Sequence, residues 1–202
     1  MQRFLAILVM ILGLSFFVNA QEHTKRPPAP ATPRPTPATP RPTPAIPAPT
    51  PVDAGDWVLY DSAIGRFSVL MPEIPKDTVE TKPSDHGPYT TYLFIARDER
   101  NVYLIGWVDY DPKFNFNRQS EMEANRDNFV KGVKATLTGS RSLMIDGYQV
   151  LEFTADTNER TFKSRVYMVG RRPYQIVIGY PREDATVAPV TKFFNSFKIS
   201  RL

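Results

Sequence analysis

The residues best suited to acid–base chemistry are two aspartates, Asp109 and Asp111, which flank Tyr110 and precede Pro112. Side chains two residues apart in a strand project from the same face, so a strand continuing through this segment would bring the two carboxyls together. Such a pair could exchange protons in hydrolysis or bind calcium. We favour the competing interpretation, in which both aspartates solvate a strand end and form the turn before the proline. A hydrolase that uses Asp109 and Asp111 stays an alternative hypothesis.

Other reactive side chains are scarce. The chain of 202 residues has no cysteine, and its two histidines, His23 and His86, stand in a proline-rich segment and in a predicted turn. This composition excludes disulfide scaffolds, thiol catalysis and metal sites built from clustered histidine and cysteine. The sequence also lacks the motifs for a nucleophilic serine, a phosphate-binding glycine loop and a dinucleotide. We therefore expect a protein that is not an enzyme and that uses no cofactor.

Aromatic side chains are the other group that could form a site, since residues 53–202 contain 21 Phe, Tyr and Trp. We expect most of them to be buried in the hydrophobic core, because aromatic side chains bury large areas and favour strands. Tyrosine and tryptophan also occupy half-buried positions, and those considered for a groove are Tyr103, Trp107, Tyr148, Tyr174 and Tyr180. Of these, Tyr103, Trp107 and Tyr174 form the partner or ligand groove that we predict, with the edge of the sheet as the other contact surface.

The distribution of charge argues against nucleic acid as a partner. The chain carries 25 Lys and Arg against 21 Asp and Glu, but residues 1–52 hold five of the basic residues and one of the acidic ones, which leaves 20 of each sign for the rest. A nucleic-acid-binding domain would show a concentrated basic face of its own. Arg160, Lys163 and Arg165 could form a basic stripe, but we expect Glu152 or Glu159 on a neighbouring strand to neutralise it by cross-strand pairing.

Residues 1–20 have the pattern of a signal peptide. Arg3 gives a positive start, fifteen mostly apolar residues follow over 4–18, and small residues precede Gln21. A membrane-spanning helix needs about 20 apolar residues, so we expect cleavage, and a membrane contact only if this segment stays uncleaved. The protein should then be secreted or periplasmic.

Residues 21–52 form a linker rich in Pro, Thr, Ala and Arg. The sequence Ala-Thr-Pro-Arg-Pro-Thr-Pro occurs at 31–37 and again at 38–44, and twelve of the 20 prolines of the chain fall between positions 27 and 51. Proline fixes φ and removes amide donors, so this segment should be disordered and extended in the polyproline II conformation. We interpret it as a semi-rigid spacer ahead of one folded domain at 53–202.

The first half of that domain shows strand patterns separated by Pro, Gly and Asx turns. They lie at 57–60, 66–71, 78–82, 89–96 and 102–110. The last of these is apolar on both faces, with Tyr103, Ile105 and Trp107 on one side and Leu104 and Val108 on the other. This pattern predicts a central strand that is covered on both sides.

The second half begins with a helical pattern over 119–136, capped by Ser120 together with Glu123. Its apolar face is predicted to hold Met122, Phe129, Val130, Val133 and Leu137, and its polar face includes Glu121 and Asn125. Strand patterns follow at 140–145, 148–154, 160–169 and 174–180, with a hairpin at Asp146-Gly147, and a closing helix at 183–196. Strands, helix, strands and helix in this order predict a mainly antiparallel sheet with helices packed against it.

Two stretches combine packing and turn residues in a familiar way. Residues 60–72 read Tyr-Asp-Ser-Ala-Ile-Gly-Arg-Phe-Ser-Val-Leu-Met-Pro, and residues 165–175 read Arg-Val-Tyr-Met-Val-Gly-Arg-Arg-Pro-Tyr-Gln, followed by Phe-Phe-Asn-Ser-Phe-Lys at 193–198. Over most of residues 57–199 the chain resembles the PsbP-like superfamily, in particular its secreted bacterial members. The resemblance implies an α+β fold, with an antiparallel β-sheet flanked by helices in an α/β/α sandwich, and a binding or accessory role outside the cytoplasm. It places no ligand residues on this sequence.

Our leading hypothesis is an exported, non-enzymatic binding or accessory domain on a proline-rich stalk. Its partner would be an envelope or extracellular protein or polymer, and not nucleic acid. The same layout of hydrophobic segment, proline-rich spacer and terminal domain leaves a second hypothesis open, a TonB-like envelope-spanning protein that keeps its N-terminal membrane anchor.

Overall fold

Two antiparallel sheets and two helices make up the described part of the chain, which comprises residues 57–85, 87–184 and 187–200 of a computed structural model. The predicted signal peptide at 1–20 and the predicted linker at 21–52 lie outside the described residues. The α+β class predicted from the sequence is confirmed.

Seven strands form the large sheet, in the order β3-β4-β5-β9-β8-β7-β6, and the paired strands are antiparallel. They are β3 (Lys76–Lys82), β4 (Tyr89–Arg97), β5 (Val102–Tyr110), β6 (Thr136–Ile145), β7 (Tyr148–Asp156), β8 (Arg160–Val169) and β9 (Arg172–Pro181). Most neighbours are joined by short hairpins, and the longer connection from β5 to β6 contains a helix. The two edges of the sheet are β3 and β6.

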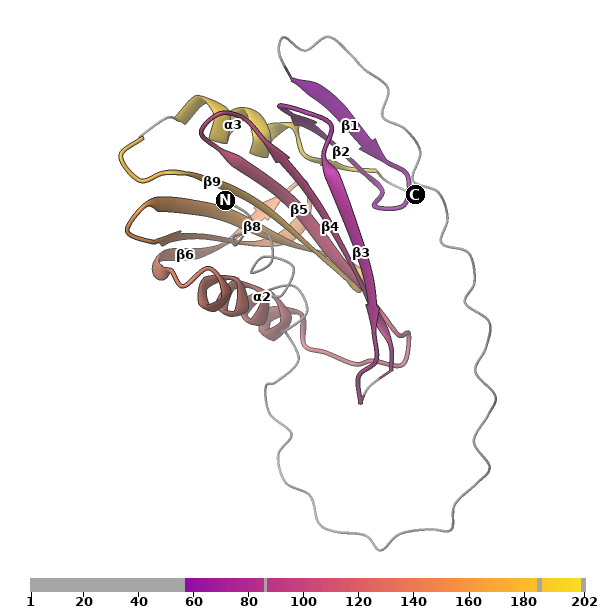
Figure 1. The fold of residues 1–202 in the computed structure, drawn as a ribbon. Helices are drawn as coiled ribbons and strands as arrows, with labels where there is room; N and C mark the ends of the chain where they lie inside the picture. The colour runs from indigo at the N-terminus through magenta and orange to yellow at the C-terminus, as the bar shows by residue number, and fades with distance from the viewer. Residues whose placement is uncertain (1–56, 86, 185–186, 201–202) are drawn as a thin grey trace, which may run out of the picture.

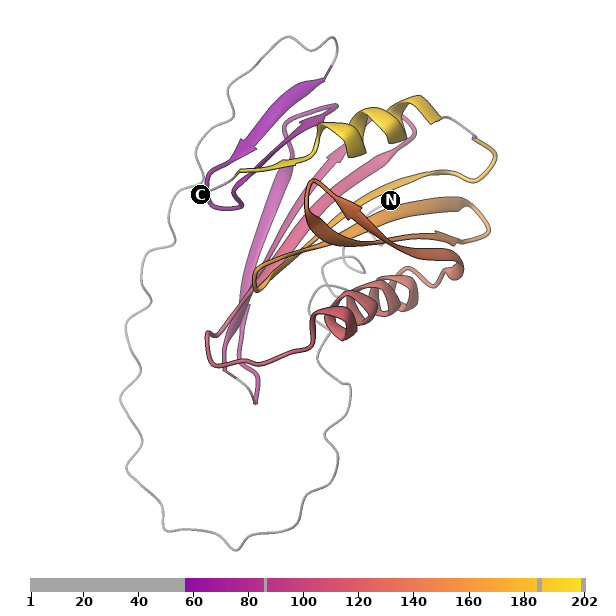
Figure 2. The ribbon, with the colours of Figure 1, turned by 180° about the vertical axis from the view of Figure 1, so that it is seen from behind.

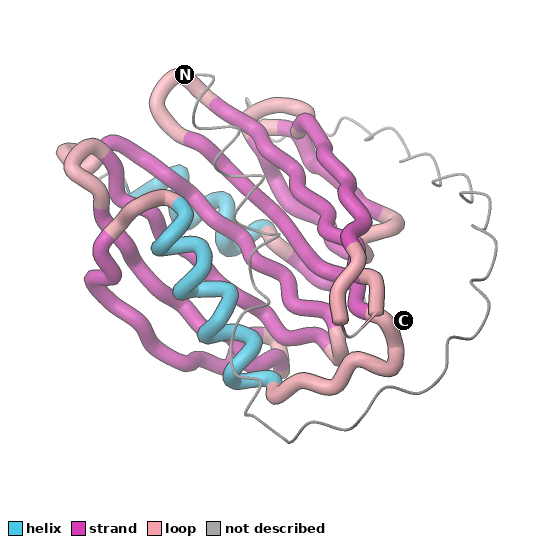
Figure 3. The backbone as a smooth tube through the Cα atoms, turned by 60° about the horizontal axis from the view of Figure 1, so that its bottom comes forward, coloured by secondary structure: helices cyan, strands magenta, loops and turns pink. Residues whose placement is uncertain are grey.

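Three strands form the small sheet, in the order β1 (Val58–Ser62), β2 (Phe67–Met71) and β10 (Lys198–Ile199). Helix α3 (Val187–Ser196) lies beside the small sheet on one face of the large sheet, and helix α2 (Arg118–Gly132) lies on the other face (Figure 1, and from behind in Figure 2). Figure 3 shows α2 lying in front of the strands of the face that it covers. We call these two faces the α3 face and the α2 face. The layers follow the predicted sandwich, with a small sheet added to one outer layer.

β5 is covered on both sides, as its sequence predicts. Tyr103, Ile105 and Trp107 pack in the cluster beneath the small sheet and α3, whereas Leu104 packs in the cluster beneath α2. β4 and β9 pair with its two edges. The hairpin at Asp146-Gly147 is also confirmed, because both residues have positive φ, at 52° and 84°, as a type I′ turn requires.

α2 departs from the prediction at both ends. The N-cap is Asn117, whose side-chain oxygen accepts a hydrogen bond from the Ser120 amide at 3.1 Å, so the prediction that Ser120 caps the helix together with Glu123 is wrong. The helix ends at Gly132 instead of position 136, because Lys134 turns into the left-handed region at φ 55°. The chain then enters β6 at Thr136.

The buried side of α2 was also predicted only in part. Met122 and Phe129 are buried, but so are Glu121 and Asn125, at 7% and 5% exposure, which the sequence pattern assigned to the solvent side. Residues four apart lie on one helix face, so Glu121 and Asn125 follow Phe129 onto the sheet. Leu137, predicted on the same apolar face, is instead an exposed residue of β6.

The closing helix begins at Val187 instead of position 183 and carries Pro189 in its first turn, where proline is tolerated. Val190, Phe193 and Phe194 pack into the core of the α3 face. The chain continues from α3 through Phe197 into β10, which pairs with β2. The sequence patterns identified β1 and β2 as strands but did not predict that they leave the main sheet and pair with the end of the chain.

Candidate functional site

The three aromatic residues of the predicted groove lie inside the protein. Tyr103 and Trp107 have no exposed surface and Tyr174 is 2% exposed, so these side chains do not line a groove that a partner could enter. The Tyr103 hydroxyl donates to Asp98 at 2.7 Å, and the Tyr174 hydroxyl donates to the Gly65 carbonyl at 2.7 Å. The Trp107 indole nitrogen has no hydrogen-bond partner among the described residues. These aromatics therefore pack between the layers of the fold.

The two aspartates of the alternative hypothesis are not paired. Asp109 binds the Arg172 guanidinium through both carboxyl oxygens, at 2.5 and 2.8 Å. Asp111 lies beyond the end of β5 and accepts a hydrogen bond from the Lys113 amide at 2.8 Å. β5 ends at Tyr110, as the strand pattern at 102–110 predicted, so the condition for pairing the two carboxyls, a strand that continues through Asp111, is not met. Asp111 forms the turn that the competing interpretation assigned to it.

One residue of the predicted basic stripe, Arg165, is paired in a cross-strand network on the α3 face. Glu152 accepts from Arg165 at 2.8 Å and from Arg141 at 2.9 and 2.5 Å, and it lies opposite both arginines in the strand register. Burial alone would raise the pKa of Glu152, but the hydrogen bonds from the two arginines hold this pKa below its ordinary value. Arg165 also stacks over the Phe194 ring of α3 at 4.7 Å. The expected pairing with Glu152 is confirmed.

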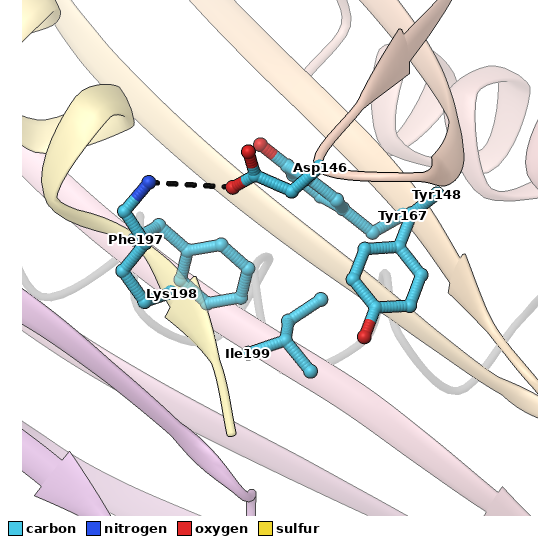
Figure 4. A pocket seen from close by; sticks show the side chains of 6 residues that line it. All are labelled: Asp146, Tyr148, Tyr167, Phe197, Lys198 and Ile199. Carbon is cyan, nitrogen blue, oxygen red and sulfur yellow. Dashed lines mark hydrogen bonds and ion pairs between the residues drawn. The ribbon is translucent and has the colours of Figure 1, made fainter. Parts of the chain in front are cut away.

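The candidate site is a small pocket at the junction of the two sheets. It is lined by Asp146, Tyr148, Tyr167, Phe197, Lys198 and Ile199 and has a volume of about 170 Å³. The β6–β7 turn and the first residue of β7 form one wall, β8 contributes Tyr167, and the segment from α3 into β10 forms the opposite wall (Figure 4). Tyr148 is the one residue of this set that the sequence analysis considered for a groove. The others come from segments far apart in the chain.

The pocket combines an aromatic and aliphatic interior with a charged rim. Tyr167 and Phe197 are buried, and their rings are tilted against each other with centroids 5.2 Å apart. Burial raises the pKa of Tyr167, which keeps its hydroxyl neutral, although the nearby Arg165 lowers this pKa somewhat. At the rim, Lys198 Nζ lies 3.3 Å from Asp146 Oδ2, and both side chains are largely exposed. Exposed ion pairs are worth little, so this rim can open at small energetic cost.

The backbone of β10 also faces this junction. The Ser200 amide donates to the Arg66 carbonyl at 2.9 Å, so Ser200 and, two residues earlier, Lys198 direct their backbone groups toward β2. In an antiparallel pair the intervening residue directs its N–H and C=O the other way. Ile199 therefore presents backbone donor and acceptor groups on the side of β10 away from β2, next to its side chain in the pocket.

The lining of the pocket is aromatic and aliphatic apart from one ion pair. None of the lining residues is a histidine, cysteine or serine, and its one carboxylate, Asp146, is paired with Lys198. Across the residues that the structure describes, no three His, Cys, Asp or Glu side chains converge as a metal site would need. Within the same ranges, neither helix has the length and hydrophobicity to cross a bilayer.

A second buried polar cluster lies beneath α2, and the sequence patterns missed it. The Tyr110 hydroxyl donates to Glu121, and the Asn125 amide donates to the same carboxyl at 3.0 Å. Burial raises the pKa of Glu121, although these two hydrogen bonds lower it in part. Glu121 and Asn125 are both buried between α2 and the sheet, so we interpret the cluster as a packing feature that fixes α2 on the sheet.

Comparison with known proteins supports the fold alone. No family model matches the chain, and no curated protein matches it in sequence. Among solved structures, the chain is similar to the solution structure of cyanobacterial PsbP (CyanoP) from Synechocystis sp. PCC 6803, with a TM-score of 0.50 and 10% sequence identity. The alignment covers 71% of this chain and 92% of the cyanobacterial one. The described domain thus has a PsbP-like fold, as the sequence resemblance implied.

The raised pKa of Glu121 gives a testable pH dependence. A carboxyl with a raised pKa in the folded state contributes stability that is complete below its unfolded pKa, about 4.3, and that is lost as the pH rises through the folded value. Glu121→Gln removes the ionisation and still offers an oxygen to Tyr110. We expect the variant to gain stability relative to wild type as the pH rises from about 4 to about 8, measured by urea unfolding.

The matched control is Glu99→Gln, at an exposed position in the β4–β5 turn. The free energy of unfolding of this variant should differ little from that of wild type over the same pH range. If the stability of Glu121→Gln relative to wild type stays constant or falls with rising pH, the buried environment does not favour the protonated form of Glu121, and the prediction is wrong.

Proposed function

We propose that the protein is an exported, non-enzymatic binding domain, held on a proline-rich stalk, whose pocket at the β10 junction receives an apolar side chain of an envelope or extracellular protein partner. The observation that carries this proposal is the pocket itself, with its aromatic lining, its weak charged rim and the outward backbone groups of Ile199. The PsbP-like fold is compatible with an accessory role but does not identify one.

The size of the pocket favours a side chain over a metabolite. Pockets for small-molecule ligands and cofactors usually enclose about 300–1,000 Å³. The pocket of about 170 Å³ is smaller, and fits one residue-sized group. A peptide lying along β10 could place such a group between Tyr148 and Ile199 and bond to the Ile199 backbone, in the manner of strand addition to a sheet edge.

The chemistry of the acidic residues supports binding over catalysis. Asp109 accepts hydrogen bonds from Arg172, and Glu152 accepts them from two arginines. Glu121 accepts hydrogen bonds from Tyr110 and Asn125. Each of these carboxyls has a structural partner, and none of them lines the pocket. No observation favours the hydrolase hypothesis over the binding domain.

The proposal of export depends on the sequence of residues 1–20 and 21–52. The apolar run of fifteen residues and the small residues before Gln21 support cleavage, which would release the domain from the membrane. Retention of the segment would instead give the TonB-like, membrane-anchored arrangement. The proline-rich segment would in either case hold the domain away from the membrane or its neighbours.

A photocrosslinking experiment tests the pocket as the contact site. A photoreactive phenylalanine derivative replaces Tyr148 in the full chain, which is expressed in its host and irradiated. We expect a covalent adduct with one protein, and its loss when Ile199→Lys places an unpaired charge in the aromatic and aliphatic interior of the pocket.

The matched control carries the same probe at Ile74, an exposed apolar residue before β3, near the opposite edge of the large sheet. That position should give no such adduct. Equal labelling from both positions, an adduct that survives Ile199→Lys in a folded variant, or no adduct from Tyr148 would each contradict the proposed site.

N-terminal sequencing of the protein isolated from its host tests export separately. We expect a mature chain that begins at Gln21, because the signal pattern ends there. A chain that begins at Met1 and is recovered in the membrane fraction would exclude the cleaved form and favour the anchored one.

A further inference from the structure

The two edges of the large sheet differ sharply in charge. β3 has four charged residues among its seven, namely Lys76, Asp77, Glu80 and Lys82, and prolines stand directly before and after it. Charges and prolines are the usual protection of an edge strand against pairing with another chain. β6 has ten residues and one charge, Arg141, and that charge is bound to Glu152. One edge is therefore protected and the other is not.

Among the described strands, β6 exposes the most large hydrophobic side chains. Three large hydrophobic side chains are exposed in the described part of the chain, and two of them, Leu137 at 38% and Met144 at 70%, are on this strand. A long edge strand that exposes apolar groups is a template for strand pairing. Neither helix covers these two side chains at the edge.

A β-bulge brings Leu137 and Met144 to the same face. Residues seven apart in a regular strand would project from opposite faces. The register of β6 on β7 shifts between Leu137 and Gly139, so that Leu137 lies opposite Ala155 and Met144 lies opposite Gln149. The Gln149 side chain donates to Gln119 of α2 at 2.9 Å, which identifies this side as the α2 face.

The α2 side of β6 therefore carries a strip that reads Leu137, Ser140, Ser142 and Met144, which we call the β6 strip. Ser140 accepts a hydrogen bond from Arg126 of α2 at 3.2 Å, which confirms its side. The strip is apolar at both ends and has small polar residues at its centre. At a two-fold axis the same surface of both copies meets, so the surface must be complementary to itself. The order apolar, polar, polar, apolar is the same in both directions along the strand and meets this requirement.

We propose that β6 pairs antiparallel with β6 of a second copy of this chain, around a two-fold axis that passes through the sheet near Arg141. In that arrangement Ser140 of one copy lies beside Ser142 of the other, and each Met144 lies beside the Leu137 of its partner. The pairing joins the two large sheets into one and supplies hydrogen-bond partners to the free edge of each strand. Both α2 helices then lie on the same face.

The distribution of charge supports a second copy as the occupant. Arg141 is the one charged residue of the strand, and its guanidinium nitrogen lies 2.5 Å from Oε1 of Glu152 on the neighbouring strand. Each copy therefore places a neutral ion pair, and not an unpaired charge, next to the axis. Residues 53–202 carry 20 basic and 20 acidic side chains, so two such domains have no net repulsion. An acidic or basic partner would find no complementary charge on the β6 strip.

This pairing is independent of the proposed partner site. The pocket opens on the α3 side, at the β6–β7 turn and β10, whereas the β6 strip lies on the α2 side. Partner binding and self-association can therefore be measured separately, and a failure of one does not decide the other.

The test is sedimentation of the purified full chain over a range of concentrations up to roughly 1 mM, with charged substitutions at the exposed centre of β6. We expect wild type to show a monomer–dimer equilibrium. Ser142→Lys and Ser142→Glu each place like charges near the axis, and each should weaken the dimer by at least about tenfold in dissociation constant. An equimolar mixture of the two variants should restore dimers, because opposite charges then meet.

The matched control is Thr78→Lys, an exposed substitution on the other edge strand, β3, which should leave the dimer unchanged. Circular dichroism of each variant establishes that it is folded. A wild-type chain that is monomeric at all concentrations overturns the proposal. So does a dimer that persists in Ser142→Lys, one that Thr78→Lys disrupts equally, or a mixture of the two Ser142 variants that stays monomeric.

Discussion

The packing of the small sheet against the α3 face of the large sheet is the contact on which the rest of the structure depends. Phe67 of β2 lies at its centre with no exposed surface. Its ring centroid lies between 5.5 and 6.4 Å from those of Phe197, Trp107, Tyr60, Tyr174 and Phe94. Truncating a buried phenylalanine typically costs roughly 3–5 kcal/mol, a large part of the total stability of a domain. Polar contacts fix the orientation, since Tyr174 and Arg172 donate to the carbonyls of Gly65 and Ile64.

This packing also creates the candidate site, because each wall of the pocket comes from a different sheet. Tyr148 and Tyr167 belong to the large sheet, whereas Ile199 belongs to the small one. The pocket therefore exists only while β10 is held beside the β6–β7 turn, and β10 is held there through its pairing with β2. The aromatic residues that were predicted to form a groove serve the site indirectly. They are the buried surface that positions its two walls.

Local features of this fold could be predicted from the sequence, because their causes lie close together in the chain. The two apolar faces of 102–110, the Asp-Gly turn at 146–147 and the cross-strand pairing of Glu152 with Arg165 all follow from alternation and turn chemistry. Features that depend on distant segments could not be predicted. The burial of Glu121 follows from Tyr110 on another element, and the pocket needs residues 146–148, 167 and 197–199 together. The alternation of Phe197, Lys198 and Ile199 was the one local sign of a short final strand.

Native-state hydrogen exchange measures the central claim most directly, because it compares the opening of the small sheet with that of the large one. If the aromatic packing joins both sheets into one cooperative unit, the slowest amides of β2 exchange at the rate of those in β5 and β9, and all respond equally to denaturant. Fast exchange of β2 by local opening, while β5 and β9 stay protected, would show that the small sheet is a separate unit and would contradict the account.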